Sequence, residues 1–216
     1  MLPDDVAGFV RTAGPEHDAI QNEMADYAAE HGFPIIGPDS GGVLRLLARL
    51  TGAERVFEFG SGYGYSAYWF LRGGADHVVL TEFDEEELEM GEEFLERAGW
   101  HDRATFEYGD AMAAIERHDG PFDVVLVDHQ KHRYADAFEA VRSKVPPGSV
   151  VVADNIMGGP VDYRTVHGGL DDGLPEDAGE STRGIVEYLR RVRGDDAFET
   201  VVLPVGSGIA VSNRVD

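Results

Sequence analysis

Carboxylate and amide side chains follow two apolar segments of this chain, and a lysine lies close to the first. DVVLVDHQKHRY places Asp128 after one candidate strand and Lys131 three residues later, and GSVVVADN places Asp154 and Asn155 after another. If these segments are neighbouring parallel strands, their carboxyl ends meet at the crevice where open α/β sheets bind ligands. Three oxygen ligands and one amine would then converge on a small space, as a divalent cation and a general base require.

Lys131 stands out because the chain almost avoids lysine. Its 18 basic residues comprise 16 Arg and two Lys, Lys131 and Lys144. Arginine is a poor base because its pKa stays above about 12, whereas a nearby cation and burial can shift a lysine amine toward neutrality. On composition alone a solvated surface lysine is the simpler interpretation, but the position between Asp128 and Tyr134 favours a catalytic one.

The composition limits the class of protein. The chain has 216 residues, enough for one domain with a sizeable core, and no Cys for disulfides or thiolate metal sites. No apolar stretch approaches the roughly 20 residues that span a bilayer, and the acidic start does not resemble a signal peptide. These features predict a soluble, cytoplasmic protein with no membrane partner.

The formal charge of −23 is extreme for this length. Nucleic-acid-binding proteins usually carry the opposite sign, so the charge weighs against a nucleic-acid partner. An acidic excess with almost no lysine is also typical of proteins that work at high salt, where the Debye length shortens to about 3 Å at 1 M. We interpret the charge as salt adaptation; the alternative is a merely acidic protein from a cell without high salt.

Strand-like and helical segments alternate through most of the chain. They predict a doubly wound, Rossmann-like α/β sheet of about seven strands, with the last antiparallel, helices on both faces and an N-terminal helical extension. Strands are expected near residues 55–59, 77–81, 104–108, 122–127, 149–154, 198–205 and 208–213. Helices are expected near residues 16–31, 40–51, 67–71, 84–97, 110–115, 134–141 and from about 182.

The same alternation predicts one domain over residues 1–216, with N-terminal helices in 1–52 and the α/β core in 53–216. Residues 156–181 interrupt the pattern because they are rich in Gly, Asp and Pro. We expect a long loop there, which would serve as a lid or a mobile segment.

A glycine-rich turn joins the first expected strand to a helix. FEFGSGYGYS places Gly60, Gly62 and Gly64 where a backbone can approach a ligand closely. An NAD site would have Gly or Ala where this chain has Tyr65, so the dinucleotide motif fits poorly. Glu58, at the apolar end of the strand, is a carboxylate that needs a partner, and the ammonium group of an amino acid would serve.

Four segments together resemble the cation-dependent O-methyltransferases, the family of the catechol and caffeoyl-coenzyme A enzymes: FEFGSGYGYSA, LTEFDEEELEMGEEFLERAG, VVLVDHQKHRY and VVVADN. The likeness runs from about Phe33 to the end of the chain. DHQKHRY departs from the catechol enzyme at Gln130, where that enzyme has an aromatic residue. The resemblance implies S-adenosylmethionine and usually Mg²⁺ as cofactors, a small hydroxylated aromatic substrate, and a homodimer.

The resemblance also implies roles for individual residues. Asp128, Asp154 and Asn155 match the metal ligands, and Lys131 matches the catalytic base. The residues that match cofactor contacts are Ile36 in the segment that closes over the cofactor, Glu58, Gly60 and Ser66 at the methionine end, Glu82 at the ribose, Asp110 and Ala111 at the adenine, and Asp128. No residue of 156–181 matches a substrate contact of the family, so the substrate is left open.

Three functions compete at this point. The first is methyl transfer to a hydroxyl of a catechol-like or hydroxylated aromatic compound, with Lys131 as general base. The second is methylation of a hydroxyuridine in transfer RNA, for which a basic patch around Arg183, Arg190, Arg191 and Arg193 would be needed. The third is a non-catalytic cofactor-binding module. In the simplest alternative for the motif, Asp128 caps the helix expected at Tyr134 and Asp154 with Asn155 forms an ordinary turn.

Overall fold

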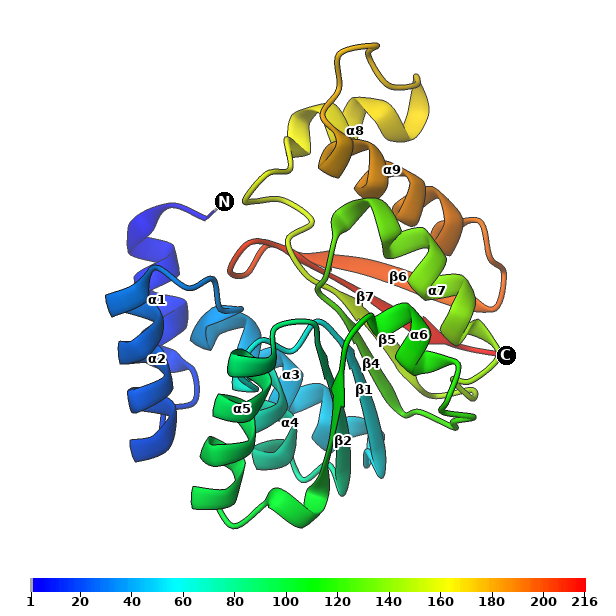
Figure 1. Cartoon of the computed structure of the whole chain (residues 1–216). Helices are drawn as coiled ribbons and strands as arrows, with labels where there is room; N and C mark the ends of the chain where they lie inside the picture. The colour runs from blue at the N-terminus through cyan, green and yellow to red at the C-terminus, as the bar shows by residue number, and fades with distance from the viewer. Residues whose placement is uncertain (1) are drawn as a thin grey trace.

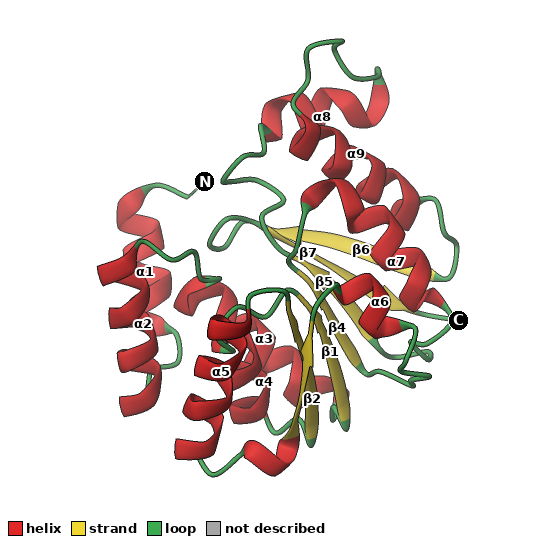
Figure 2. Cartoon of the chain, in the orientation of Figure 1, coloured by secondary structure: helices red, strands yellow, loops and turns green. Residues whose placement is uncertain are grey.

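A seven-stranded sheet lies between two layers of helices in the computed structural model, which describes residues 2–216 (Figure 1, Figure 2). The strand order is β3-β2-β1-β4-β5-β7-β6, and β7 runs antiparallel to both of its neighbours. The strands are β1 (Arg55–Phe59), β2 (His77–Glu82), β3 (Ala104–Tyr108), β4 (Val124–Val127), β5 (Val150–Ala153), β6 (Phe198–Leu203) and β7 (Ile209–Arg214). The predicted doubly wound sheet with an antiparallel last strand is confirmed.

Helices cover both faces of this sheet. The helices are α1 (Asp4–Ala13), α2 (Ala19–His31), α3 (Gly37–Thr51), α4 (Tyr65–Gly73), α5 (Glu85–Arg97), α6 (Ala111–Ile115), α7 (Tyr134–Arg142), α8 (Tyr163–Asp171) and α9 (Glu180–Arg193). α3, α4 and α5 pack on one face, and α6, α7 and α9 pack on the other (Figure 1). Within residues 2–216, no helix combines the length and the apolar character needed to cross a bilayer.

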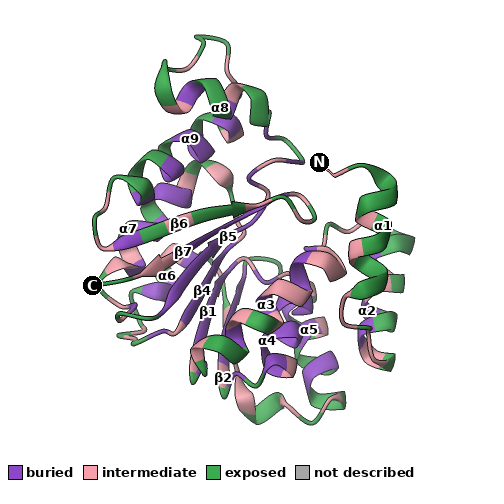
Figure 3. Ribbon diagram, turned by 180° about the vertical axis from the view of Figure 1, so that it is seen from behind, coloured by how far each residue is buried: buried purple, intermediate pink, exposed green. Residues whose placement is uncertain are grey.

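The central strands are apolar on both sides because both faces are covered. Val125 of β4 belongs to the core on the side of α7 and α9, and its neighbour Leu126 belongs to the core on the side of α3 and α4. Adjacent side chains of a strand point to opposite faces, so a strand buried on both faces reads as one apolar run. Figure 3 shows this buried centre with exposed residues on the outer helices.

Two parts of the helical prediction are wrong. α1 was not expected, although its acidic first turn is a favourable helix start, and none of its residues is buried. The expected long loop of residues 156–181 contains α8, and α9 begins at Glu180. Asp162 caps α8 by accepting a hydrogen bond from the backbone N–H of Arg164 (3.0 Å), and Val166 is buried. The apolar side of α8 packs on α9. The Gly and Asp content of this segment is typical of a loop, so the helix could not be recognised from composition.

The carboxyl ends of β1 and β4 form the point where the strand order reverses. The two strands are parallel, with Phe59 opposite Val127, and β2 and β5 lie on their outer sides. Doubly wound sheets bind ligands in the crevice outside such a point. The glycine-rich turn follows β1 and Asp128 follows β4, so the fold places both predicted motifs at this crevice.

The side chain of Asp84 caps the first turn of α5, directly after β2. Asp84 Oδ1 accepts hydrogen bonds from the backbone N–H groups of Glu86 (3.0 Å) and Glu87 (3.3 Å) at the start of α5. We expect Asp84→Ala to lower the free energy of unfolding by about 1 kcal/mol, because both amides lose their acceptor. Urea denaturation measures this. Glu89→Ala, at an exposed site in the same helix, should cost less than about 0.5 kcal/mol, and equal losses would contradict the capping role.

Candidate functional site

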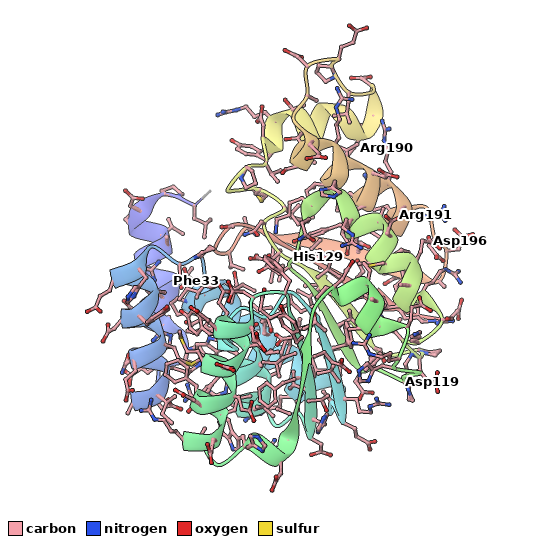
Figure 4. All side chains as sticks on the ribbon, viewed as in Figure 1. Phe33, Asp119, His129, Arg190, Arg191 and Asp196 are labelled. Atoms are coloured by element: carbon pink, nitrogen blue, oxygen red, sulfur yellow. The ribbon has the colours of Figure 1, made fainter. Side chains whose placement is uncertain are left out.

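A cavity of about 610 Å³ opens at the carboxyl ends of the parallel strands. Its walls come from the segments after β1, β2, β3, β4 and β5, and from residues 33–36 between α2 and α3. The predicted site residues that line it are Ile36, Gly60, Ser66, Glu82, Asp110, Ala111, Asp128, Lys131, Asp154 and Asn155. Figure 4 labels two of its walls, Phe33 from the α2–α3 link and His129 from the turn after β4.

The glycine-rich turn approaches the β4 turn at backbone distance. Gly60 has a φ of 82°, in the left-handed region, and a Cβ there would lie 2.8 Å from the carbonyl oxygen of Asp128. The backbone N–H of Gly60 donates to Thr81 Oγ1 (3.2 Å). Glycine is therefore required at this position for both conformation and space.

Lys131 lies in the short 3₁₀ turn Lys131–Arg133, and its side chain is only 10% exposed. Its Nζ donates to Asp128 Oδ1 (2.9 Å), to the Tyr134 hydroxyl (2.7 Å) and to the carbonyl oxygen of His129 (3.3 Å). The Tyr134 hydroxyl in turn donates to the carbonyl oxygen of Asp154 (3.2 Å). The structure thus brings the predicted base together with two of the predicted metal ligands.

Asp128 does not cap the following helix. The N-cap position of α7 is Arg133, and no side chain makes a capping hydrogen bond there. Asp128 instead pairs with Lys131, and desolvation raises the pKa of the Asp128 carboxyl while Lys131 opposes the rise. The simpler capping interpretation of the motif is therefore wrong.

Asp154, next to Asn155, presents a buried carboxylate oxygen that no described residue pairs with. Asp154 is 1% exposed, and its Oδ1 has no hydrogen-bond partner among residues 2–216, while Oδ2 accepts from Asn155 Nδ2 (3.0 Å). Burial, with a further contribution from Asp128, raises the pKa of Asp154 to about 8. Asn155 has a φ of 55°, in the left-handed region. Asn tolerates this conformation in turns, so it is the buried, unpaired Oδ1 of Asp154 and not the backbone that favours a functional role over an ordinary turn.

The donor set at this end of the cavity fits a hard cation. Two carboxylates and an amide oxygen are ligands that Mg²⁺ prefers, and the unpaired Oδ1 of Asp154 offers a free buried acceptor. No cluster of three or more His, Cys, Asp or Glu able to hold a metal occurs within residues 2–216. Any cation here would therefore depend on the mixed set of Asp128, Asp154 and Asn155, with the remaining coordination positions open.

Glu58 is the one predicted site residue that does not line the cavity. It is fully buried, and neither carboxylate oxygen has a hydrogen-bond partner among the described residues. Burial raises the pKa of Glu58 to about 8; Asp128 adds to the rise, and the neighbouring Ser66 opposes it. Since Ser66 and Asp128 both line the cavity, an unpaired carboxylate lies directly behind its wall.

Glu82, at the end of β2, holds two turns together through its carboxylate. Oε2 accepts from the backbone N–H of Gly62 (2.9 Å), and Oε1 accepts from those of Phe83 (2.8 Å) and Asp84 (3.1 Å). The residue is 5% exposed and lines the cavity. Its orientation is therefore set by the backbone before any ligand arrives.

Asp110 follows β3 and lines the cavity, and its carboxylate is already paired. Its two oxygens accept from the guanidinium of Arg133 (3.0 and 3.1 Å), and Oδ1 also accepts from the backbone N–H of Met112 (2.9 Å). The hydrogen bond from Arg133 lowers the pKa of Asp110. Arg133 also lines the cavity and was not predicted, although its place two residues after Lys131 could have indicated it.

Phe83 and His129 are further lining residues that the sequence left without a role. The Phe83 residue is 69% exposed, at the rim after Glu82. The His129 ring lies 5.6 Å from the Tyr134 ring and nearly parallel to it, and its two nitrogens lack hydrogen-bond partners among residues 2–216. Desolvation, with Arg133 and Lys131, lowers the pKa of His129 to about 3. A neutral imidazole therefore borders the cavity, whereas His132 is exposed.

Comparison with known proteins places this geometry in a family. Residues 13–215 match the family model described as O-methyltransferase. Tricin synthase 2 from Oryza sativa subsp. japonica is 30% identical over 213 residues, covering 93% of this chain and 71% of that protein. Catechol O-methyltransferase from Niastella koreensis is 30% identical over 152 residues, covering 67% and 68%.

A solved structure shows the same fold. The O-methyltransferase TomG from Streptomyces achromogenes, involved in tomaymycin synthesis and solved in complex with SAM, superposes with a TM-score of 0.84 at 23% identity over 100% of both chains. At that identity the likeness concerns the fold, while the family model and the two relatives concern ancestry. The chain therefore belongs to the S-adenosylmethionine-dependent O-methyltransferases, in the family of the catechol and caffeoyl-coenzyme A enzymes.

Proposed function

We propose that this enzyme transfers the methyl group of S-adenosylmethionine to a hydroxyl of a small catechol-like or hydroxylated aromatic acceptor. In this proposal Lys131 is the general base, and Asp128, Asp154 and Asn155 hold a divalent cation, Mg²⁺ or a similar ion. The observation that carries it is the hydrogen bonding of Lys131 Nζ to Asp128 and to Tyr134, whose hydroxyl bonds the backbone of Asp154. The names of the relatives, a tricin synthase and a catechol methyltransferase, support a phenolic acceptor.

The cofactor is proposed to lie along the glycine-rich turn. Gly60 and Ser66 would contact its methionine end, with the Glu58 carboxylate behind them to balance the ammonium group. Glu82 would accept from the ribose hydroxyls, since its carboxylate is already aimed by three backbone amides. The adenine would lie toward Asp110 and Ala111, and Ile36 would close the cavity from the α2–α3 link. This arrangement puts the sulfonium methyl near Asp128 and Lys131.

Methyl transfer forms a bond between the acceptor oxygen and the methyl carbon and breaks the bond from that carbon to sulfur. The acceptor hydroxyl gives its proton to Lys131 Nζ, and the products are a methyl ether and S-adenosylhomocysteine. A bound divalent cation would supply positive charge that favours an ionised acceptor oxygen. Tyr134 holds the Lys131 amine at 2.7 Å. Alignment of oxygen, methyl and sulfur would supply up to about 7–11 kcal/mol of the barrier reduction.

The transfer RNA alternative has weaker support because three of the four arginines it needs are engaged within the protein. Arg183 donates to the carbonyl oxygens of Pro175, Glu176 and Ala178, Arg190 to that of Gly169, and Arg191 to the Glu139 carboxylate. Figure 4 labels Arg190 and Arg191 along α9, away from His129.

The expected single domain, homodimer, cytoplasmic location and salt adaptation stay predictions.

Replacement of Lys131 tests the base. We expect Lys131→Met to lower kcat by about 10²–10⁴-fold, because the acceptor proton loses its acceptor. Binding of S-adenosylhomocysteine, measured by calorimetry, should stay within about twofold of wild type. Lys144→Met changes the other lysine of the chain, which donates to the carbonyl oxygens of Ile115 and His118, and should keep turnover. Wild-type kcat in a folded Lys131→Met protein would rule out the proposed base.

Removal of divalent cations tests the metal. We expect dialysis against EDTA to abolish methyl transfer from labelled S-adenosylmethionine to 3,4-dihydroxybenzoate, and added Mg²⁺ to restore it. Mg²⁺ should also raise the Tm of the wild-type protein, because it binds the folded state alone. Asp154→Asn should lose both responses, since it removes one carboxylate charge from the donor set. Full turnover in EDTA, or labelling of bulk transfer RNA in place of the catechol, would contradict the proposal.

Glu58 predicts a pH dependence of cofactor binding. Burial raises the pKa of Glu58 to about 8, and an ammonium partner favours the ionised carboxylate. Binding should therefore release a proton below pH 8, and affinity for S-adenosylhomocysteine should rise by up to about tenfold between pH 6 and pH 7. Calorimetry in buffers of different ionisation enthalpy measures both. Glu58→Gln should bind more weakly with a flatter pH profile, and an unchanged profile would show that Glu58 does not contact the ammonium.

A further inference from the structure

Helix α9 lies directly against the turn that carries Lys131, and a single glycine makes this possible. Gly184 is buried in α9. A Cβ there would overlap the carbonyl oxygen of Lys131 and would lie 2.6 Å from both the carbonyl carbon of Lys131 and the Cα of His132. These atoms are backbone, so they cannot rotate aside as the end of a side chain could. An alanine at this position would force α9 and the turn apart.

The conformation of the helix does not explain the glycine. The φ of Gly184 lies outside the left-handed region, so any residue could adopt this backbone. Glycine inside a helix costs about 1 kcal/mol relative to alanine. The close approach to Lys131 is therefore the physical reason for a residue that otherwise weakens α9.

A second residue of α9 supports the partner of Lys131. Tyr188 follows Gly184 by one turn and so lies on the same side of the helix. Its buried ring meets the Tyr134 ring edge to face, with centroids 5.8 Å apart and an interplanar angle of 83°. Tyr134 provides the shortest hydrogen bond of the Lys131 amine, at 2.7 Å. α9 thus contacts both the backbone that carries the amine and the ring that holds it.

We propose that Gly184 and Tyr188 are positioning residues, through which α9 sets the place of the Lys131 amine beside Asp128 and Tyr134. The catalytic consequence rests on the proposed role of Lys131 as base. The positioning itself does not, because it concerns the location of Lys131 whether or not the amine accepts a proton.

The two lysines of the chain allow a direct test. Labelling with ε-¹³C-lysine gives NMR signals from Lys131 and Lys144 alone, and the Lys131→Met protein assigns them. In Gly184→Ala we expect the Lys131 signal to shift and the Lys144 signal to stay, since Lys144 bonds to Ile115 and His118. With 3,4-dihydroxybenzoate as acceptor, kcat should fall by about 10²-fold, the loss that a displacement of about 1 Å can cause. The Kd of S-adenosylhomocysteine should stay within about twofold.

Gly168→Ala is the matched control. Gly168 lies in α8, and a Cβ there would meet no atom within 4 Å. This variant makes the same chemical change in a helix, and it should keep both lysine signals and kcat at wild-type values. A loss of kcat in both glycine variants would show that the effect is not specific to the contact with Lys131.

Tyr188 supplies a second test that does not add an atom against the turn. Tyr188→Leu should shift the Lys131 signal, because the Tyr134 ring loses its edge partner. Tyr188→Phe keeps the ring and removes a hydroxyl that lacks a hydrogen-bond partner among the described residues. Its Lys131 signal should therefore match that of the wild-type protein. This pair decides the question if Gly184→Ala fails to fold.

The outcomes separate the two proposals. A folded Gly184→Ala protein with wild-type Lys131 signal and kcat, or a Tyr188→Phe protein that shifts the signal as Tyr188→Leu does, would overturn the positioning role. Absence of methyl transfer to any phenolic acceptor by the wild-type enzyme would overturn the proposed function instead. The NMR comparison would still decide where α9 places Lys131.

Discussion

The parallel pairing of β1 with β4 is the constraint on which the site depends. Phe59 lies opposite Val127, so the chain leaves both strands at the same level, and the N–H of Asp128 donates to the carbonyl oxygen of Phe59 (2.9 Å). Because Gly60 has no side chain, the two turns meet backbone to backbone. The turn after β1, proposed to bind the cofactor, and the turn after β4, proposed to carry the base and a cation ligand, are thereby held at a fixed separation. A reaction that depends on alignment needs this rigidity more than it needs many catalytic groups.

The same crevice concentrates polar groups that the protein does not satisfy. Both oxygens of Glu58 and one of Asp154 are buried without a partner among the described residues, and such groups cost free energy unless something pairs with them. The cost appears as raised pKa values, because burial favours the neutral carboxyl. In the proposed function, the ammonium group of the cofactor would pair with Glu58, and a divalent cation would pair with Asp154. The unpaired carboxylates therefore fit the chemistry proposed for this site.

The sheet could be predicted from the sequence because its signals are local. Apolar runs such as that of β4, stops at glycine and caps such as Asp84 act within a few residues, and the alternation of strands and helices predicts a doubly wound sheet. α8 escaped prediction because its reason to fold is not local. α8 is stabilised by packing on α9, and the Oγ1 of Thr182 in α9 accepts the backbone N–H of Asp162 before α8 (3.1 Å). The residues expected to form a lid therefore pack on α9, and none of 156–181 lines the cavity.

By itself the sequence determined the chemical character of the site: a lysine where arginine is the rule, carboxylates and an amide after two strands, and glycines after a third. Tertiary structure alone decided the partners, because a contact between residues distant in the chain depends on how whole elements pack. It paired Asp110 with Arg133 and packed α9 against the Lys131 turn at Gly184. No local pattern marks Gly184, since its φ is ordinary and its meaning lies in the backbone that it touches, more than 50 residues earlier in the chain.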